Sequence, residues 1–404
     1  MPRGFRSSKG GSTCLRLKKS LYGLRTAPRL WHKHLRVALL KELGFKVSAF
    51  DPCLYYRNDV LAILYVDDLG LAFSSEAVLE DMLVTLKSLG FEYTRKGTFS
   101  EFLGIQFSYD RQKKRVTMTQ GGLIEKILDC KGMGACKPNN MPTSQIALGD
   151  DENGKRMTER WNYSSVVGML LYLSTHTRPD ICFAVSQIAR FTHNPKQSHA
   201  KAVKTLLRYL KGTVNLGISF QPPSVSLHAM KVLPLEDYVD ADFADLYRVE
   251  SPGSPLTAKS RTRYLISLCE CPLVWKSQLQ SGVALSTQEA EYTALSQSAR
   301  VLLPIRDICN EALNHLNIGP TLEIPQIVCV AFEDNKGALL LANNQRLTRR
   351  TKYYHVNLHW FWTHVKDGSF QVKGISSHLQ NADYLTKPLP LVIFLANRKR
   401  VQGF

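Results

Sequence analysis

Apolar and polar positions repeat with two different periods along the first third of the chain. Residues 30–45 and 77–91 carry apolar side chains at helical spacing, and each stretch closes near a glycine, which is typical of a helix C-terminus. Residues 53–73 are rich in strand-forming side chains and predict consecutive strands. Residues 98–120 favour a hairpin, and residues 121–133 favour a short helix. This part of the chain is therefore predicted to mix strands and helices.

The pattern changes twice farther along. Residues 163–213 show apolar stripes with basic faces and predict a helical block. After residue 235 come three strand-like stretches, a long helix from Ser286, a strand, a helix, a last strand and a short terminal helix. This order predicts a mixed five-stranded sheet with helices packed against it. The strand-like stretches are residues 235–244, 263–270, 272–279, 326–334 and 369–376.

Two polar stretches, residues 144–158 and 221–234, are predicted to be linkers. With 404 residues, the chain is long enough for two or three domains. The expected fold class is a multidomain α+β or α/β chain. Its predicted parts are residues 1–143, 159–220 and 235–390, followed by a tail at residues 391–404.

Composition narrows the class of protein. Hydrophobic residues make up 44% of the chain, which suits globular cores, and no apolar run approaches the roughly 20 residues that a membrane span needs. The basic N-terminus lacks the apolar block of a secretory signal. The nine cysteines show no metal-binding spacing, so we expect reduced thiols in an intracellular protein.

The charge indicates a polyanionic partner. Lysine and arginine together number 52 against 34 acidic residues, which gives a net charge of +18. Nucleic acid is the simplest partner for such a chain, and a basic solvated surface without a role is the alternative. We expect no membrane partner.

Two adjacent carboxylates interrupt an apolar stretch. Asp67 and Asp68 stand inside LAILYVDDLGLAF, between two strand-forming runs. Adjacent carboxylates repel each other and resist leaving water, so we expect them at the tip of a hairpin. They are either part of an ordinary exposed turn or the ligands of a strongly positive group.

A second set of acids lies in the last part of the chain. Asp240 is expected on a strand, Glu291 inside a helix, Asp334 at a strand end and Asp383 at a helix start. Ser286 and Glu289 fit a capping box, which gives Glu289 a local structural role. Glu291 instead falls on the apolar stripe of its helix, where an acid is unfavourable unless it is paired or binds a cation. Glu291 is therefore the functional candidate, and a buried hydrogen-bonded acid is the alternative.

Several long motifs, in order, resemble one family. A Tyr-x-Asp-Asp tip at Tyr65–Asp68 between hydrophobic strands resembles the catalytic hairpin of reverse transcriptases. LKKSLYGLRTAPRLW, FDPCLYY, EFLGIQ and VVGMLLYLSTHTRPDICFAVSQIARF resemble copia-type LTR retrotransposon polymerases, from about residue 4 to residue 390. The resemblance implies that Asp67 and Asp68 hold Mg²⁺ and that residues 1–143 are a partial palm and thumb. The family's third aspartate and its fingers precede LKKSLYGL, so we expect an incomplete polymerase site here.

The order Asp, Glu, Asp, Asp resembles RNase H, which follows the polymerase in this family. The resemblance implies that residues 159–220 are a helical connection and that residues 235–390 form an RNase H-like domain. It assigns Asp240, Glu291, Asp334 and Asp383 as ligands of two Mg²⁺ ions, for which Mn²⁺ is a possible substitute. Asp242 is a lesser candidate, and His378 lies where many RNase H enzymes keep a mobile histidine.

The implied partners are an RNA–DNA hybrid, an RNA template with a DNA primer, and the remaining Pol segments. The compartment would be a cytoplasmic particle or the nucleus. The residues expected to contact nucleic acid are Arg25, Arg29, Arg346, Arg349, Arg350 and Lys352. For the segment around Arg346, a solvated basic loop is the alternative.

Two residues depart from the family pattern. Arg263 and Asp245 stand where relatives usually have glycine, and we expect a clash or a strained backbone there. These departures favour a rival function, a catalytically dead nucleic-acid-binding remnant. A two-metal nuclease unrelated to retroelements is a further rival.

Overall fold

The computed structural model describes most of the chain, in two compact units. The first unit comprises Met1–Gly97 with His315–Asn317, and the second comprises Thr98–Asn314 with Ile318–Phe404. The side chains of residues 355–359 are not described. The described residues are 17–57, 60–144, 147–159, 161–221, 230–247, 249–251, 253–254, 256–315, 325–344, 355–385 and 389–404.

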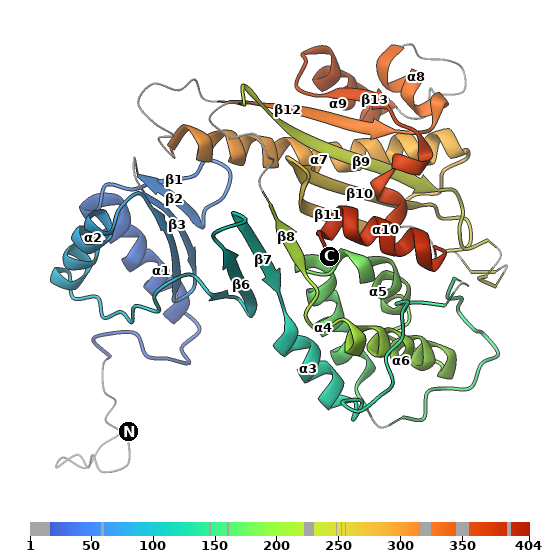
Figure 1. Ribbon diagram of the computed structural model, residues 1–404, viewed down its shortest axis with the longest axis horizontal. Coiled ribbons are helices and arrows are strands. Elements are labelled where there is room, and N and C mark those ends of the chain that lie inside the picture. The colour runs from blue at the N-terminus through green and yellow to red at the C-terminus, as the bar shows by residue number, and fades with distance from the viewer. Residues whose placement is uncertain are drawn as a thin grey trace, which may run out of the picture. The chain divides into compact units, whose positions relative to one another are not determined.

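The first unit is a four-stranded sheet with helices on one face. The sheet is antiparallel, in the order β1-β2-β3-β4. Burial in β3 alternates, with Val60, Ala62 and Leu64 buried, because successive strand residues point to opposite faces. These residues share a core with Leu39 and Met82 from the helices. The elements are α1 (Ala27–Val37), the π-helix η1 (Ala38–Glu42), β1 (Lys46–Val47), β2 (Leu54–Arg57), β3 (Val60–Tyr65), β4 (Asp68–Phe73) and α2 (Glu76–Ser88) (Figure 1).

The second unit begins with an antiparallel sheet that joins distant parts of the sequence. The predicted hairpin is present as β6 (Ile105–Asp110) and β7 (Arg115–Thr119), with β5 (Glu101–Phe102) beside β6. β8 (Ile218–Phe220) pairs with β7 and completes the order β5-β6-β7-β8. Residues from the predicted polymerase part and from the predicted connection therefore share one sheet. The boundary placed at residue 143 does not separate two folded bodies.

A helical block follows, as the apolar stripes predict. Its core is shared by α3, α4, α5 and α6. The side chain of Asn162 caps α4 by accepting a hydrogen bond from the Ser165 N–H at 2.9 Å. The elements are α3 (Gly121–Cys130), α4 (Tyr163–His176), the 3₁₀ turn η2 (Pro179–Ile181), α5 (Cys182–Ala189) and α6 (Gln197–Gly212).

A buried ion pair sits at the centre of this block. Arg178 donates to both carboxylate oxygens of Asp180, at 2.8 and 2.7 Å, and both side chains are fully buried. The Tyr209 hydroxyl also donates to Asp180, and the Arg178 guanidinium donates to the Thr213 carbonyl. The charges are thus satisfied inside an apolar core.

The predicted tail, residues 391–404, is instead a packed helix. α10 (Leu391–Gln402) buries Phe394 and Val401 in the same core as the helical block (Figure 1). Its last residue, Gln402, donates to the Gly217 carbonyl at 2.9 Å and accepts from Tyr384 at 2.7 Å. The correction has a physical cause, since a helix that buries two large apolar side chains is not free in solvent.

The large sheet is mixed and five-stranded, as predicted. Its order is β11-β10-β9-β12-β13, with β9, β10 and β11 antiparallel and β9, β12 and β13 parallel. The strand β9 starts at Val232, inside the predicted linker 221–234, of which residues 222–229 lie outside the described residues. The strands are β9 (Val232–Asp242), β10 (Arg261–Leu268), β11 (Cys271–Leu279), β12 (Gln326–Glu333) and β13 (Gln371–Gly374).

Helices cover both faces of this sheet. α7 (Thr287–His315), α8 (Lys336–Asn344) and α9 (His355–Lys366) pack on one face. Two 3₁₀ turns, η5 (Ser377–Leu379) and η6 (Asn381–Leu385), follow β13, and η6 contributes to the core on the other face with α10 and the helical block (Figure 1). Within the described ranges, no helix is both long and apolar enough to cross a membrane.

Candidate functional site

The predicted hairpin of the first unit is present. β3 and β4 pair antiparallel with Tyr65 opposite Asp68, so Val66 and Asp67 form a two-residue turn. Asp68 is the first residue of β4 rather than a turn residue. Val66 has a φ of 53°, a left-handed conformation that a β-branched side chain rarely adopts. Both aspartates are exposed.

Side chains of the same unit contact this tip. The Tyr22 hydroxyl donates to Asp67 at 2.7 Å, and the Trp31 indole N–H donates to the Val66 carbonyl at 3.1 Å. Lys96 lies 3.5 Å from Asp68. In the part of the chain that the structure describes, the hairpin acids do not join a third acid in a group that could hold a metal ion.

The predicted phosphate contacts are only partly described. Arg25 precedes α1 and Arg29 lies within it, and both are exposed. The other predicted contacts, Arg346, Arg349, Arg350 and Lys352, lie outside the described residues.

Three of the four acids of the second set converge. Asp240 is on β9, Glu291 is in the second turn of α7, and Asp334 directly follows β12. Each offers an oxygen, and these oxygens all lie within 4.8 Å of one another. The register explains part of this, because β12 pairs parallel with β9 and sets Phe332 beside Tyr238. Asp334 lies two residues after Phe332, and Asp240 lies two residues after Tyr238, so the two acids come out side by side.

Glu291 lies on the buried stripe of α7, as predicted. Its residue is only 4% exposed. Burial raises the pKa of its carboxyl well above the usual range, and the neighbouring acids Glu333, Asp240 and Asp334 raise it further. The Ala241 N–H donates to this carboxylate, but its Oε2 has no hydrogen-bond partner among the described residues. One buried oxygen is thus available for a cation.

Glu289 has the local role that the sequence predicts. The Ser286 hydroxyl accepts from the Glu289 N–H at 3.2 Å. The Glu289 carboxylate accepts from the N–H of Leu285 at 2.6 Å, one residue earlier than a standard capping box uses. Two glutamates only two positions apart, on different faces of α7, therefore serve different purposes.

Asp383 and His378 lie at the margin of the cluster. Asp383 is within the short turn η6, not at the start of an α-helix, and its charge contributes to raising the pKa of Asp240. It is not one of the three acids that converge within 4.8 Å. His378 is exposed on η5 and its Nδ1 lies 3.0 Å from the Ser376 hydroxyl. The neighbouring Ser377 hydroxyl donates to Asp334 at 2.8 Å and so orients that carboxylate.

Sequence reasoning missed a further acid, Glu333. It is fully buried at the end of β12, where burial raises the pKa of its carboxyl. The Asn335 N–H donates to its Oε1 at 2.9 Å, and its Oε2 has no partner among the described residues. The signal was present in the sequence, because Glu333 continues the every-second-residue series Ile327, Cys329 and Ala331, which lies on the buried face of β12.

Arg263 and Asp245 themselves show no strained backbone angle, so the strain expected at these two residues is wrong, although Ala244, directly before Asp245, has a φ of 52°. β10 pairs regularly with β9 through Arg263, and neither residue has a positive φ. Asp245 instead accepts from the Arg261 Nε at 3.0 Å. Both side chains are thus paired with charges on neighbouring segments.

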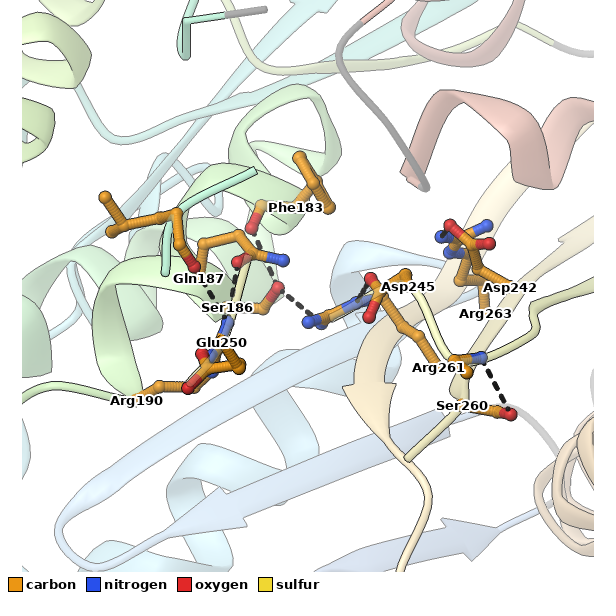
Figure 2. A network of polar contacts seen from close by, with 12 residues as sticks. Phe183, Ser186, Gln187, Arg190, Asp242, Asp245, Glu250, Ser260, Arg261 and Arg263 are labelled. Atoms are coloured by element: carbon orange, nitrogen blue, oxygen red, sulfur yellow. Dashed lines mark hydrogen bonds and ion pairs between the residues drawn. The ribbon is translucent and has the colours of Figure 1, made fainter. Parts of the chain in front are cut away.

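Arg263 pairs with the acids of β9. It stands directly opposite Asp240 across the β9–β10 ladder. Its Nη1 donates to Asp240 at 2.8 Å. Its Nη2 donates to Asp242 at 2.9 Å, and these two side chains lie together in Figure 2. The Arg263 side chain is only 2% exposed. One oxygen of the acid cluster is therefore already engaged by a cation of the chain itself.

A polar network joins the same end of β10 to the helical block. Arg261 donates to the Ser186 hydroxyl of α5 at 3.0 Å (Figure 2). Arg190, also at the end of α5, donates to Gln187 at 2.9 Å and pairs with Glu250. These contacts fix the sheet against α5.

The acid cluster fits a divalent cation. Carboxylate oxygens are the ligands that Mg²⁺ and Mn²⁺ prefer. Convergence of three carboxyl groups is unfavourable without a positive charge among them. Arg263 supplies one such charge, and the unpartnered oxygens of Glu291 and Glu333 leave room for another.

Comparison with known proteins agrees with the motifs. Residues 1–145 match the family model described as reverse transcriptase (RNA-dependent DNA polymerase). The chain is 31% identical to the retrovirus-related Pol polyprotein from transposon TNT 1-94 of Nicotiana tabacum, over 96% of this chain and 28% of that protein. It is 32% identical to the corresponding polyprotein from transposon RE1 of Arabidopsis thaliana, over 97% of this chain and 25% of that protein.

Two further similarities have narrower scope. An uncharacterized mitochondrial protein of Arabidopsis thaliana is 31% identical over 59% of this chain and 92% of its own length. The crystal structure of RNase H1 from the halophilic archaeon Halobacterium salinarum NRC-1 matches 38% of this chain and 93% of its own, with 13% identity and a TM-score of 0.22. At that score the likeness carries no argument.

The similarity to the transposon proteins extends over nearly the whole chain, although the chain spans only about a quarter of their length. The hairpin with its two aspartates lies within the segment that matches the reverse transcriptase model. The chain belongs to the family of copia-type retrotransposon Pol polyproteins, and its first part is a reverse transcriptase segment.

Proposed function

We propose that the acid cluster of the second unit hydrolyses the RNA strand of an RNA–DNA hybrid with the help of divalent metal ions. The observation that carries this proposal is the convergence of Asp240, Glu291 and Asp334 within 4.8 Å. These acids come from a strand, a helix and a strand end that are far apart in sequence, and the family's RNase H part follows its polymerase.

Each acid has a distinct part in the proposed site. Asp240, Glu291 and Asp334 would hold the metal, and Asp383 on η6 adds negative charge that acts on Asp240. Bound Mg²⁺ would supply a Lewis acid and a water of lowered pKa at the scissile phosphate. Ser377 holds Asp334 in position through its hydroxyl. Glu333 adds negative charge beside the ligands from a fully buried position.

The substrate class follows from charge and family. A net charge of +18 favours binding of a phosphate backbone over binding of a neutral or cationic substrate. A hybrid duplex is the nucleic acid that a polymerase copying RNA into DNA would present to a neighbouring nuclease. We therefore propose the RNA–DNA hybrid as substrate rather than single-stranded RNA.

The test compares two variants of one helix. Glu291→Gln removes a charge and little volume, and we expect it to abolish Mg²⁺-dependent cutting of a labelled hybrid. Glu289→Gln alters the helix cap, and we expect it to keep cutting while costing about 1 kcal/mol of stability. Circular dichroism checks that both variants are folded. Equal loss of cutting in both variants, or equal cutting of single-stranded RNA, would refute the assignment.

A second candidate function, a nucleic-acid-binding remnant without catalysis, rests on one specific observation. The Arg263 guanidinium donates to Asp240, which is one of the three acids of the cluster. Under this proposal the hybrid binds and remains uncut in Mg²⁺. The same assay with wild-type chain separates the two functions.

A further inference from the structure

We propose that Arg263 is a resident cation that competes with a divalent metal ion for Asp240, so that metal binding requires displacement of its guanidinium. This inference rests on the proposed function, because it concerns the same carboxylates. It goes beyond that function by assigning a metal-opposing role to a residue of the neighbouring strand.

The position of Arg263 follows from strand register. Because Arg263 stands opposite Asp240 in the antiparallel ladder, the two side chains project from the same face of the sheet. Asp242 lies on that face as well, two residues along β9. The guanidinium donates to both acids, at 2.8 and 2.9 Å, and bridges them.

Burial strengthens the attraction between Arg263 and Asp240. The Arg263 side chain is 2% exposed and that of Asp240 is 13% exposed, so solvent screens their attraction weakly. The planar guanidinium loses little conformational entropy for each hydrogen bond that it forms with the two carboxylates. A metal ion bound by Asp240 would stand close to the guanidinium, and the repulsion between the two positive charges would displace the guanidinium.

The surrounding acids leave the site with an excess of negative charge. Arg263 pairs with Asp240 and Asp242, while Glu291 and Asp334 converge with Asp240, and Glu333 is buried beside Asp334. The site thus retains attraction for a cation, and Arg263 weakens that attraction rather than abolishing it. A lower metal affinity than the acids alone would give is the expected consequence.

Titration of Mn²⁺ alone into the full chain, followed by calorimetry, measures this competition directly. Arg263→Met removes the charge and keeps most of the volume, and we expect Mn²⁺ to bind at least about tenfold more tightly than to the wild type. Arg263→Lys keeps the charge, so its affinity should stay near that of the wild type. Lys336→Met removes the same charge from an exposed position near Asp334 and serves as the matched control, with little change expected.

Glu291→Gln separates failure of this inference from failure of the proposed function. If Glu291→Gln abolishes Mn²⁺ binding while Arg263→Met binds no better than the wild type, the metal site stands and the competition is refuted. If Arg263→Met binds Mn²⁺ more weakly, Arg263 positions Asp240 for the metal and the proposal is overturned. If no variant binds Mn²⁺, both the site and the inference fall.

Folding of the variants is part of the test. Removal of the guanidinium leaves two acids close together, so Arg263→Met should be less stable without metal and should gain more thermal stability from Mn²⁺ than the wild type does. Arg263→Gln, which keeps hydrogen-bond donors, serves as a second neutral variant. If neither neutral variant folds with or without Mn²⁺, Arg263 is a structural counter-ion that metal cannot replace, and the proposal is refuted.

Discussion

The buried carboxyl of Asp237 makes the stability of the second unit depend on pH. Asp237 lies on β9 between Leu235 and Val239, on the face that packs against α7, and it is fully buried. The Ser298 hydroxyl lies beside the carboxyl and donates to the Leu295 carbonyl, and its contact with Asp237 lowers the pKa by less than burial raises it. Burial raises the pKa of Asp237 from 3.8 to about 7.

The direction of the effect follows from proton binding. Below about pH 4 the carboxyl is protonated in both the folded and the unfolded chain, so it costs no stability. As the pH rises from about 4 to about 7, the unfolded chain releases the proton while the folded chain retains it, and the free energy of unfolding falls. The shift from 3.8 to about 7 corresponds to about 4 kcal/mol lost at pH 8.

Asp237→Asn removes this titration while keeping the shape of the side chain. We expect the variant to be more stable than the wild type by about 4 kcal/mol at pH 8 and by about 2 kcal/mol at pH 5. Urea unfolding followed by tryptophan fluorescence reports on the second unit, because four of the five tryptophans lie there.

Asp129→Asn is the matched control, since it neutralises an exposed aspartate of the same unit. Its effect should be small and independent of pH. A gain from Asp237→Asn that does not grow between pH 5 and pH 8 would refute the reasoning, because the gain would then come from packing rather than from the proton.

The remaining predictions concern the hairpin turn, the buried ion pair and polymerase activity. Val66→Gly should stabilise the turn by about 1 kcal/mol, because glycine adopts the positive φ of residue 66 without strain. Slower amide hydrogen exchange in β3 and β4 would show this, and faster exchange would contradict it. Arg178→Met should lower the free energy of unfolding by about 3–5 kcal/mol, because it leaves the Asp180 carboxylate buried without its ion pair. Adding Asp180→Asn should recover part of that loss, and an unchanged urea midpoint in Arg178→Met would count against the prediction. The chain alone should not extend a DNA primer on an RNA template in Mg²⁺, because Asp67 and Asp68 join no third acid within the described ranges; robust extension would show that a further ligand exists.

Periodicity predicted the framework well because it reports directly on burial. The order of strands and helices after residue 235 predicted a mixed five-stranded sheet, which is present. The helical stripe distinguished Glu291 from Glu289, and the structure buries the first and uses the second as a cap. These properties depend on near neighbours in the sequence, so they can be read from it.

Contacts between strands could not be predicted in the same way. Arg263 lies opposite Asp240 because of the register in which β9 and β10 pair. The sequence between the two strands does not reveal that register. The expectation of strain at Arg263 treated the residue alone, without the acids that accept its hydrogen bonds. The packing of α10 was likewise missed, because its partners, such as Gly217, lie far back in the chain.

The pairing of β7 with β8 makes the second unit discontinuous in the sequence. β8 obtains its backbone partners from residues 116–118, about a hundred positions earlier. A shorter chain that began at residue 144 would leave β8 as an unpaired edge, and Ile218 would lose part of its cover. Exposed edges of this kind promote association between chains. A truncated chain intended to retain the acid cluster should therefore begin near Thr98, where the second unit begins.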